Sequence, residues 1–352
     1  MPTAVELNNV DIIFGRKPRK ALPLVDAGLN RDEIIRRTGN VVGVSGASLT
    51  IGAGEIVVLM GLSGSGKSTL LRAVNGLAPV IRGSVLVDTA DGPVDPYRAT
   101  ARSLRRLRAE TVSMVFQQFA LLPWRTVAEN VGFGLELSGI RGRERRERVE
   151  DQLALVNLSE WADHPVSALS GGMQQRVGLA RAFATGAPVL LMDEPFSALD
   201  PLIRLHLQDE LLALQERLKK TILFVSHDLD EAFRIGNRIA IMEGGRIVQT
   251  GTPRDIVRQP ATPYVLDFVG NINPLNYLTA EDIMLPVTDR AQLQANVSAT
   301  ARPTAPVTEV LRALAQNPGT IGVVDKGRVV GTISAREAAA GLARRNPSNF
   351  AA

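Results

Sequence analysis

Short apolar runs without charge alternate with amphipathic stretches along most of the chain. The runs at residues 56–60, 189–192 and 221–225 are four or five residues long and contain no charged side chain. Such runs are typical of strands that are buried on both faces of a parallel sheet. Residues 239–242 and 246–248 flank a Gly-Gly pair and predict a hairpin. The pattern therefore predicts an α/β fold, in which ligands bind beyond the carboxyl ends of the strands.

A glycine-rich segment directly follows the first of these runs. Residues 61–68 are Gly-Leu-Ser-Gly-Ser-Gly-Lys-Ser, which has the form G-x-x-x-x-G-K-[ST] of a phosphate-binding loop. A helix is expected to begin at Lys67, and free N–H groups at a helix start favour an anion. Lys67 is expected to reach the β- and γ-phosphates, and Ser68 is expected to ligate Mg²⁺. The candidate phosphate-binding residues are Gly61, Ser63, Gly64, Ser65, Gly66, Lys67, Ser68 and Thr69.

Polar side chains follow the other two buried runs. Asp193 and Glu194 come directly after residues 189–192, and His227 comes shortly after residues 221–225. Hydrolysis of a γ-phosphate requires charge neutralisation and a water placed in line. We expect Asp193 to lie near the metal, Glu194 to polarise the water and His227 to sense the γ-phosphate, a role also expected of Gln117. The candidate catalytic residues are Glu194, His227, Gln117 and Lys67, and the candidate metal ligands are Ser68, Gln117 and Asp193.

These residues also have ordinary structural interpretations. A lone histidine is usually structural or exposed, and Asp193-Glu194 alone would be a common end of a strand. The neighbours Ser226 and Asp228, and the order of the motifs along the chain, favour the functional interpretation.

A further motif, Leu-Ser-Gly-Gly-Met-Gln at residues 169–174, precedes an apolar, alanine-rich helix expected to end near residue 185. Ser170 can cap that helix, and a capped helix start can also bind phosphate. Together with the preceding motifs, this signature resembles the ATP-binding cassette (ABC) ATPases. The resemblance implies a P-loop NTPase fold of the ABC type, with a helical subdomain at about residues 118–185 and with ATP and Mg²⁺ as ligands.

The resemblance also implies that two chains share each ATP site. One chain has one phosphate loop and one signature, so two complete sites need a second copy of the same chain. The signature would meet the γ-phosphate held by the other copy, and residues 197–200 would lie at the dimer seam. Asp200 before Pro201 suits a helix start at this seam. The nucleotide-binding residues implied in this way are Ser170, Gly171, Gly172, Gln174 and Asp200.

Other segments indicate a subfamily. After a strand expected at residues 10–14, an insertion contains a capping-box pattern at residues 30–33, which predicts a short extra helix that ends at Thr38-Gly39. This insertion and three other segments resemble the ATPase subunits of glycine betaine/proline betaine/choline importers. The other segments are residues 60–63, 116–123 and 226–232, and the resemblance covers roughly residues 1–275. The resemblance implies transmembrane permease subunits, an extracytoplasmic substrate-binding protein, and a peripheral position at the cytoplasmic face of the membrane.

Several alternatives stay open. Import of another solute is one, because nothing in this chain need touch the cargo. A non-transport ABC ATPase of DNA repair or translation is disfavoured, because the chain has neither a long coiled coil between loop and signature nor a second cassette. Phe14 is a candidate for stacking on adenine or a core residue that ends a strand. Trp124 follows Gln117 at the expected hinge, and either packs in the core or elsewhere within the chain, or docks a permease helix.

The ATPase is expected to span residues 1–270, and the character of the chain changes in residues 271–352. Residues 307–314 pattern as a helix, and residues 320–334 predict two strands around a Lys-Gly turn, followed by another helix. This order resembles a CBS module, although related importers usually have two and this chain has room for one. We therefore predict a small α+β module, with dimerisation, a vestigial role and regulation all open.

Composition changes this picture little. The 352 residues contain no cysteine, which excludes disulfides and thiolate chemistry. The net charge of +4 comes with basic stretches at residues 102–108 and 141–148, but no aromatic residues are interleaved there. We therefore expect solvated helix faces, with basic residues near an anionic cytoplasmic leaflet as the alternative, and no nucleic-acid binding. No signal peptide is expected at the start, and no apolar run approaches the ~20 residues that a membrane span needs.

Overall fold

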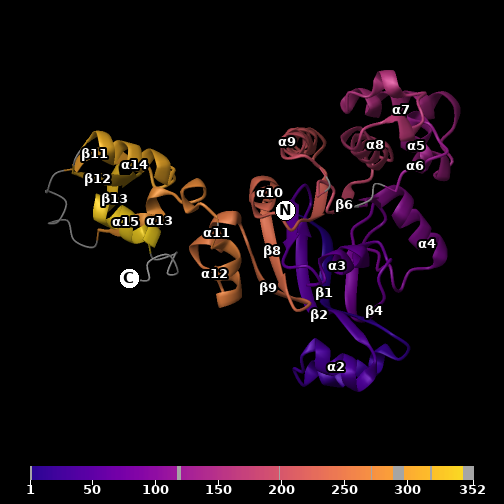
Figure 1. Cartoon of the computed structure of the whole chain (residues 1–352), viewed down its shortest axis with the longest axis horizontal. Helices are drawn as coiled ribbons and strands as arrows, with labels where there is room; N and C mark the ends of the chain where they lie inside the picture. Colours follow the sequence, from indigo (N-terminus) through magenta and orange to yellow (C-terminus); the bar gives the residue numbers. More distant parts are fainter. Residues whose placement is uncertain are drawn as a thin grey trace. The chain divides into compact units, whose positions relative to one another are not determined.

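The computed structural model describes residues 2–116, 120–197, 199–270, 272–287, 297–317 and 319–343. The chain divides into two compact units, residues 1–250 and 251–352. The first unit contains two sheets and most of the helices, and the second contains a small sheet with its own helices (Figure 1).

A six-stranded sheet forms the centre of the first unit, in the order β5-β6-β7-β3-β8-β9. Its strands are β3 (Ile56–Met60), β5 (Val112–Val115), β6 (Val189–Asp193), β7 (Thr221–Val225), β8 (Arg238–Glu243) and β9 (Arg246–Gly251). The strands from β5 to β8 are parallel. Every residue of β3, β6 and β7 is buried, which confirms the prediction from the apolar runs. The segments that follow these three strands therefore meet at one edge of the sheet.

An antiparallel sheet accompanies the first one. Its strands, in the order β2-β1-β4, are β1 (Thr3–Phe14), β2 (Val41–Gly52) and β4 (Val80–Val87). One hydrophobic core joins strands of both sheets with α3 (Lys67–Val74), which contributes Leu70, Leu71, Ala73 and Val74. The helix that follows the phosphate loop is thus held firmly in the interior.

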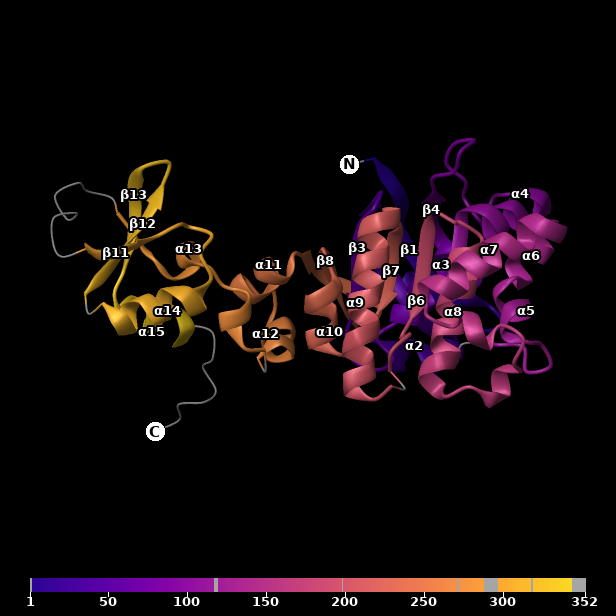
Figure 2. The same cartoon turned by 90° about the horizontal axis from the view of Figure 1, so that it is seen from above.

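Helices surround the sheets. Those of the region after β5 are α5 (Val127–Val131), α6 (Phe133–Leu137), α7 (Gly142–Leu155) and α8 (Gly171–Ala184). They share a separate hydrophobic core and lie together at one end of the unit (Figures 1 and 2). The other helices of the first unit outside the insertion include α4 (Ala101–Arg106), α9 (Pro201–Leu218) and α10 (Leu229–Ile235). Helix α4 continues into a π-helical turn (Leu107–Thr111).

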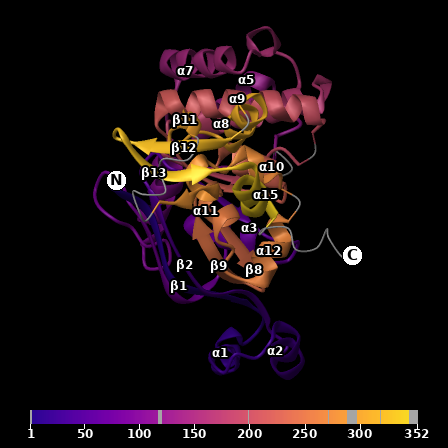
Figure 3. The same ribbon diagram turned by 90° about the vertical axis from the view of Figure 1, so that its left-hand side faces the viewer.

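The insertion after β1 forms a 3₁₀ turn (Pro18–Ala21), α1 (Leu22–Asp26) and α2 (Arg31–Thr38). The predicted extra helix is α2: the Asn30 side chain accepts from the Glu33 N–H at 2.9 Å, and Gly39 ends the helix at φ +66°. Ile34 packs with Ile13, Ala21, Val25 and Val42 in a small core of its own. The two helices project from the first unit beyond β1 and β2 (Figures 1 and 3).

The second unit is a four-stranded sheet with helices. Its elements are α11 (Pro253–Arg258), α12 (Pro263–Val269), a 3₁₀ turn (Pro274–Asn276), α13 (Ala280–Ile283), β10 (Leu285–Pro286), β11 (Val297–Ala301), α14 (Val307–Gln316), β12 (Thr320–Asp325), β13 (Arg328–Ile333) and α15 (Ala335–Ala343). The strand order is β10-β13-β12-β11, with β12 and β13 antiparallel around Lys326-Gly327 as the sequence predicted.

The unit begins earlier in the chain than the predicted module. Arg254 of α11 pairs with Asp282 of α13 at 2.9 Å, so α11 contacts α13 of the same unit. The ATPase boundary at residue 270 and the assignment of a CBS-like module stay predictions.

Candidate functional site

Two glycines shape the loop between β3 and α3. Gly61 has φ +141° and Gly66 has φ +101°, conformations that residues with a Cβ rarely adopt. A Cβ on Gly61 would lie 2.1 Å from the carbonyl oxygen of Met242, and a Cβ on Gly66 would lie 2.5 Å from that of Gly43. The loop therefore packs so closely against β8 and β2 that only glycine fits at both positions.

Lys67 begins α3 and is 5% exposed. Its Nζ donates to the carbonyl oxygens of Gly61 at 2.8 Å and Leu62 at 3.1 Å, so the ammonium lies within the curl of the loop. Burial lowers the pKa of Lys67, and the negative charges of Glu194 and Asp193 oppose that lowering. The loop thus holds a cation close to two carboxylates.

Asp193 and Glu194 are neighbours at the end of β6 with different surroundings. Asp193 is 1% exposed, and its Oδ2 accepts from Nη2 of Arg72 at 2.9 Å. Its Oδ1 is buried and has no hydrogen-bond partner among the described residues. Glu194 has φ +47°, and its N–H donates to the carbonyl oxygen of Val225 at 3.1 Å. A left-handed residue directly after a buried strand turns the chain, and the Glu194 carboxylate comes to lie beside His227.

His227 follows β7, and its Nδ1 lies 3.1 Å from Oε2 of Glu194. The imidazole is 56% exposed, whereas the segment next to it is fixed in the interior. The buried carboxylate of Glu231 accepts hydrogen bonds from the Ser226 hydroxyl and from the side-chain amide of Gln208. Burial raises the pKa of Glu231, and these two hydrogen bonds oppose the increase.

A cavity of about 570 Å³ brings most of these groups together. The predicted site residues that line it are Phe14, Ser63, Gly64, Gly66, Lys67, Ser68, Thr69, Glu194 and His227. Phe14 is 41% exposed, so the alternative that it is a core residue is wrong. The lining residues that were not predicted include Arg31, Asp32 and Ile35, which all come from α2. The capping pattern predicted their helix, but nothing in the sequence indicated that it faces the phosphate loop.

Comparisons with known proteins identify the family. A family model described as ABC transporter matches residues 44–197. ProV of Escherichia coli, a glycine betaine/proline betaine transport system ATP-binding protein, is 49% identical over 283 residues, which are 80% of this chain and 70% of ProV. The chain belongs to the ATP-binding subunits of ABC transporters. It is thereby an ATP-hydrolysing subunit, as its motifs predicted.

Two further comparisons refine this family membership. TmoW of Ruegeria pomeroyi, a trimethylamine N-oxide transport system ATP-binding protein, is 41% identical over 333 residues, which are 94% of each chain. A solved dimeric ATP-binding cassette in a post-hydrolysis state, bound to ADP and Pi, is 31% identical with a TM-score of 0.59. That comparison covers 71% of this chain and 98% of the other. The ABC fold of the first unit therefore has a solved counterpart.

The ABC signature lies away from the cavity of its own chain. Ser170 caps α8 by accepting from the Met173 N–H at 3.4 Å, and Gln174 Nε2 donates to the Leu169 carbonyl oxygen at 3.1 Å. Asp200 caps α9 by accepting from the Leu202 N–H at 3.1 Å. The predicted nucleotide-binding residues that do not line the cavity include Ser170, Gly171, Gly172, Gln174 and Asp200. Both helix starts are thus formed and available to another molecule.

The end of β6 provides donors suited to Mg²⁺. This ion takes six oxygen ligands, usually one or two carboxylates with phosphate oxygens and water. The partnerless Oδ1 of Asp193 is a free carboxylate oxygen, and Ser68 at the start of α3 lines the cavity. No cluster of three or more His, Cys, Asp or Glu side chains within the described ranges could hold a metal alone. The residues therefore fit an ion that phosphate oxygens also ligate. Gln117, the third predicted ligand, lies outside the described residues.

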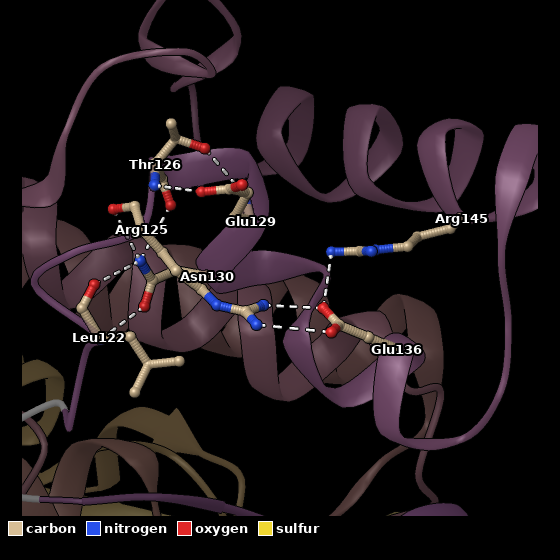
Figure 4. A network of polar contacts seen from close by, with 7 residues as sticks. All are labelled: Leu122, Arg125, Thr126, Glu129, Asn130, Glu136 and Arg145. Atoms are coloured by element: carbon tan, nitrogen blue, oxygen red, sulfur yellow. Dashed lines mark hydrogen bonds and ion pairs between the residues drawn. The ribbon is translucent and has the colours of Figure 1, made fainter.

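A rigid loop precedes α5 and displays Trp124, whose side chain is 76% exposed. The fully buried Asn130 accepts from the Leu122 N–H at 2.8 Å and donates to three carbonyl oxygens, including that of Thr126 at 2.9 Å (Figure 4). Arg125 pairs with Glu136 at 2.8 Å in the same network. The hypothesis that Trp124 packs in the core is therefore wrong.

In the part of the chain that the structure describes, no helix is long and apolar enough to cross a membrane.

Proposed function

We propose that this chain powers an importer of a quaternary ammonium solute, with glycine betaine, proline betaine or choline as the cargo. The observation that supports this cargo class best is the 49% identity to ProV over 80% of the chain. Trimethylamine N-oxide is a second candidate, because TmoW matches 94% of the chain and so extends into the second unit. All these solutes have methylated nitrogen, which a separate binding protein would recognise.

The residues of the cavity have distinct proposed roles in hydrolysis. Lys67 neutralises the β- and γ-phosphates from within its loop, and Phe14 stacks on adenine at the cavity rim. Glu194 polarises the attacking water, and His227, 3.1 Å from that carboxylate, keeps it oriented and contacts the γ-phosphate. The proposed Mg²⁺ ligands are Ser68, Gln117 and Asp193. The ion would supply positive charge for the phosphate oxygens, which is the main requirement of phosphoryl transfer.

We further propose that two copies of the chain complete each ATP site. Ser170, Gly171, Gly172 and Gln174 of one copy would contact the γ-phosphate held by the other, and Asp200 would lie at the seam. The absence of these residues from the cavity lining supports this arrangement, as does the dimeric state of the solved cassette. A capped helix start presents free N–H groups, which suits a phosphate.

The proposed partners outside the dimer are transmembrane permease subunits and an extracytoplasmic substrate-binding protein. We propose that the chain lies at the cytoplasmic face of the membrane and that Trp124 docks a permease helix. A large exposed aromatic side chain on a rigid loop is typical of a binding hot spot. Trp124→Ala should leave ATP binding by the isolated chain unchanged and weaken permease association by about 2 kcal/mol or more. Unchanged association in a pull-down titration would contradict this role.

Residues 271–352, which belong to the second unit, are proposed to form a single CBS-like module. Its order of helix, strand, turn, strand and helix between α14 and α15 supports this assignment. If this module regulates transport, a chain that ends at residue 270 should still transport the solute, but its uptake rate should not change with the internal salt concentration. An unchanged salt response in the truncated chain would leave dimerisation or a vestigial role.

Uptake by proteoliposomes tests the proposed function. Vesicles would contain this chain, its permease and its binding protein, with ATP inside, and labelled glycine betaine, proline betaine, choline and trimethylamine N-oxide would be compared. Uptake of one of the first three that is absent with Glu194→Gln supports the proposal. Uptake of trimethylamine N-oxide alone favours the second candidate. ATP hydrolysis without uptake of any of the four contradicts the cargo class.

A further inference from the structure

The guanidinium of Arg31 connects the insertion to the phosphate loop. Nη1 donates to the carbonyl oxygen of Gly64 at 2.7 Å, and Nη2 donates to that of Gly43 on β2. A Cβ on Gly245, in the turn after β8, would lie 2.2 Å from Nη2. Arg31 is thus inserted where the phosphate loop, β2 and the β8–β9 turn meet, although it comes from a helix outside both sheets.

The helix that presents Arg31 is fixed at both ends and in its middle. Asn30 caps its start, Gly39 ends it, and Ile34 is 2% exposed in the small core beside β1 and β2. Arg31 is the first residue of the helix, directly after its cap. The fold of the insertion therefore places Arg31 beside the phosphate loop.

The charge of Arg31 has no acidic partner among the residues that the structure describes. Within the described ranges, no carboxylate forms an ion pair with it, and both hydrogen bonds go to neutral carbonyl oxygens. Burial lowers its pKa, and its Nε is buried without a hydrogen-bond partner. A buried charge without a counter-ion costs free energy unless a ligand provides one. The cavity that Arg31 lines is also lined by Lys67, Ser68 and Glu194.

We propose that Arg31 is a nucleotide-binding residue, whose guanidinium neutralises the phosphate chain of ATP from the side opposite the strand-end carboxylates. The inference rests on the proposed ATP site and adds the insertion to it. Arg31 keeps the phosphate loop in place through Gly64, and the anionic phosphates supply the counter-charge that the described part of the chain does not provide. Binding of the nucleotide thereby also stabilises α2 against the phosphate loop.

Nucleotide affinity separates this role from simple bracing of the loop. Arg31→Gln keeps N–H donors for the carbonyl oxygens but removes the charge, and Arg31→Lys keeps the charge. ATP would be titrated calorimetrically and adenosine by ligand-observed NMR, both in EDTA to prevent hydrolysis. Arg31→Gln should weaken ATP binding about tenfold to a hundredfold. It should leave adenosine binding unchanged, and Arg31→Lys should restore most of the ATP affinity.

The controls distinguish the possible failures. Arg37→Gln removes an exposed cation of the same helix, paired with Glu33, and should bind ATP as the parent chain does. Lys67→Ala should lose ATP binding, and if it does not, the proposed site itself is wrong. Two results would overturn the inference about Arg31 alone, provided that Lys67→Ala loses ATP binding. Arg31→Gln could bind ATP as tightly as the parent chain does, or it could weaken the binding of ATP and of adenosine by the same factor. The melting temperature without nucleotide would show whether Arg31→Gln is folded. If it is not folded, Arg31→Lys decides the question: a retained preference for ATP over adenosine supports the proposal, and a lost preference contradicts it.

Discussion

The two sides of the ATP cavity are stabilised in different ways. On the phosphate-loop side, the cations Lys67 and Arg31 donate to backbone carbonyl oxygens of glycine-rich segments. On the strand-end side, Asp193 and His227 depend on side chains from elsewhere, such as Arg72 for Asp193. The partners of Lys67 belong to the loop itself, whereas Arg31 and Asp193 have partners far away in the sequence. A local motif therefore specifies the loop and Lys67 almost alone, but it specifies neither Arg31 nor the surroundings of the strand-end carboxylate.

The difference also applies to charge. Lys67 is buried and Arg31 is partly buried, and burial lowers the pKa of both. Neither forms an ion pair with a carboxylate in the described ranges. Asp193 has one oxygen in an ion pair and one without a partner. Both sides are therefore incompletely neutralised without the proposed magnesium-bound triphosphate. We expect ATP binding to depend mainly on the first side and hydrolysis mainly on the second.

The largest predicted effect separates chemistry from binding. Glu194→Gln removes the proposed base but keeps the size of the side chain, so ATP turnover should fall by about 10²–10⁴-fold. ATP affinity should stay close to that of the parent chain, because Lys67 is untouched. Phosphate release and calorimetric titration measure the two quantities. Normal turnover would remove the assigned role from Glu194.

A substitution on the phosphate-loop side should affect the fold itself. Gly61→Ala places a Cβ 2.1 Å from the Met242 carbonyl oxygen in a backbone conformation that alanine rarely adopts. Strain and overpacking together should lower the free energy of unfolding by at least about 2 kcal/mol. Gly92→Ala is a matched control, because it has a similar positive φ but open space around it, so it lacks the overpacking contribution. Equal losses in urea denaturation would contradict the close packing of the loop.

On the strand-end side, removing a distant partner should cost somewhat less. Arg72→Met leaves the buried Asp193 carboxylate without its ion pair, which should lower the free energy of unfolding by about 1–3 kcal/mol. Arg37→Met breaks an exposed pair and should change it by less than about 0.5 kcal/mol. Urea denaturation of both variants gives the comparison. If Arg72→Met were as mild as Arg37→Met, the strand-end side would not depend on that partner.

The smallest predicted effect concerns pH. Burial raises the pKa of Glu231, so the folded chain binds this proton more tightly than the unfolded chain does. Its favourable contribution is complete below the ordinary pKa of 4.5 and decreases as the pH rises through the higher pKa of the folded state. Glu231→Gln should therefore gain stability relative to the parent chain between pH 5 and pH 8. Urea denaturation at both values tests the sign, and a parallel pH dependence would contradict it.

Much of the fold could be predicted, for reasons visible in particular residues. The runs before Gly61 and Asp193 are uncharged because their strands are buried on both faces, and Asn30 with Gly39 bounded α2 correctly. Two strands of the second unit were missed. β10 has only two residues, and β11 reads Val-Ser-Ala-Thr-Ala, in which weak apolar alternation gives little signal.

The site was predicted less completely than the fold. Residues of the motifs after β3, β6 and β7 meet as expected, because each of these motifs follows a buried strand. Arg31 was missed because its partners are carbonyl oxygens 12 and 33 residues away, and carbonyl oxygens give no residue-type pattern. The Arg72–Asp193 pair was missed for a similar reason, since 121 residues separate its members.

The most direct test of the two-chain ATP site is the molecular mass of the Glu194→Gln chain in solution, measured by light scattering with and without ATP and Mg²⁺. One chain has a mass of 37.8 kDa. We predict one chain without nucleotide and a stable pair with ATP and Mg²⁺, and Ser170→Arg in the same background should prevent pairing. A single-chain mass with ATP bound, or pairing that is unaffected by Ser170→Arg, would contradict the shared site.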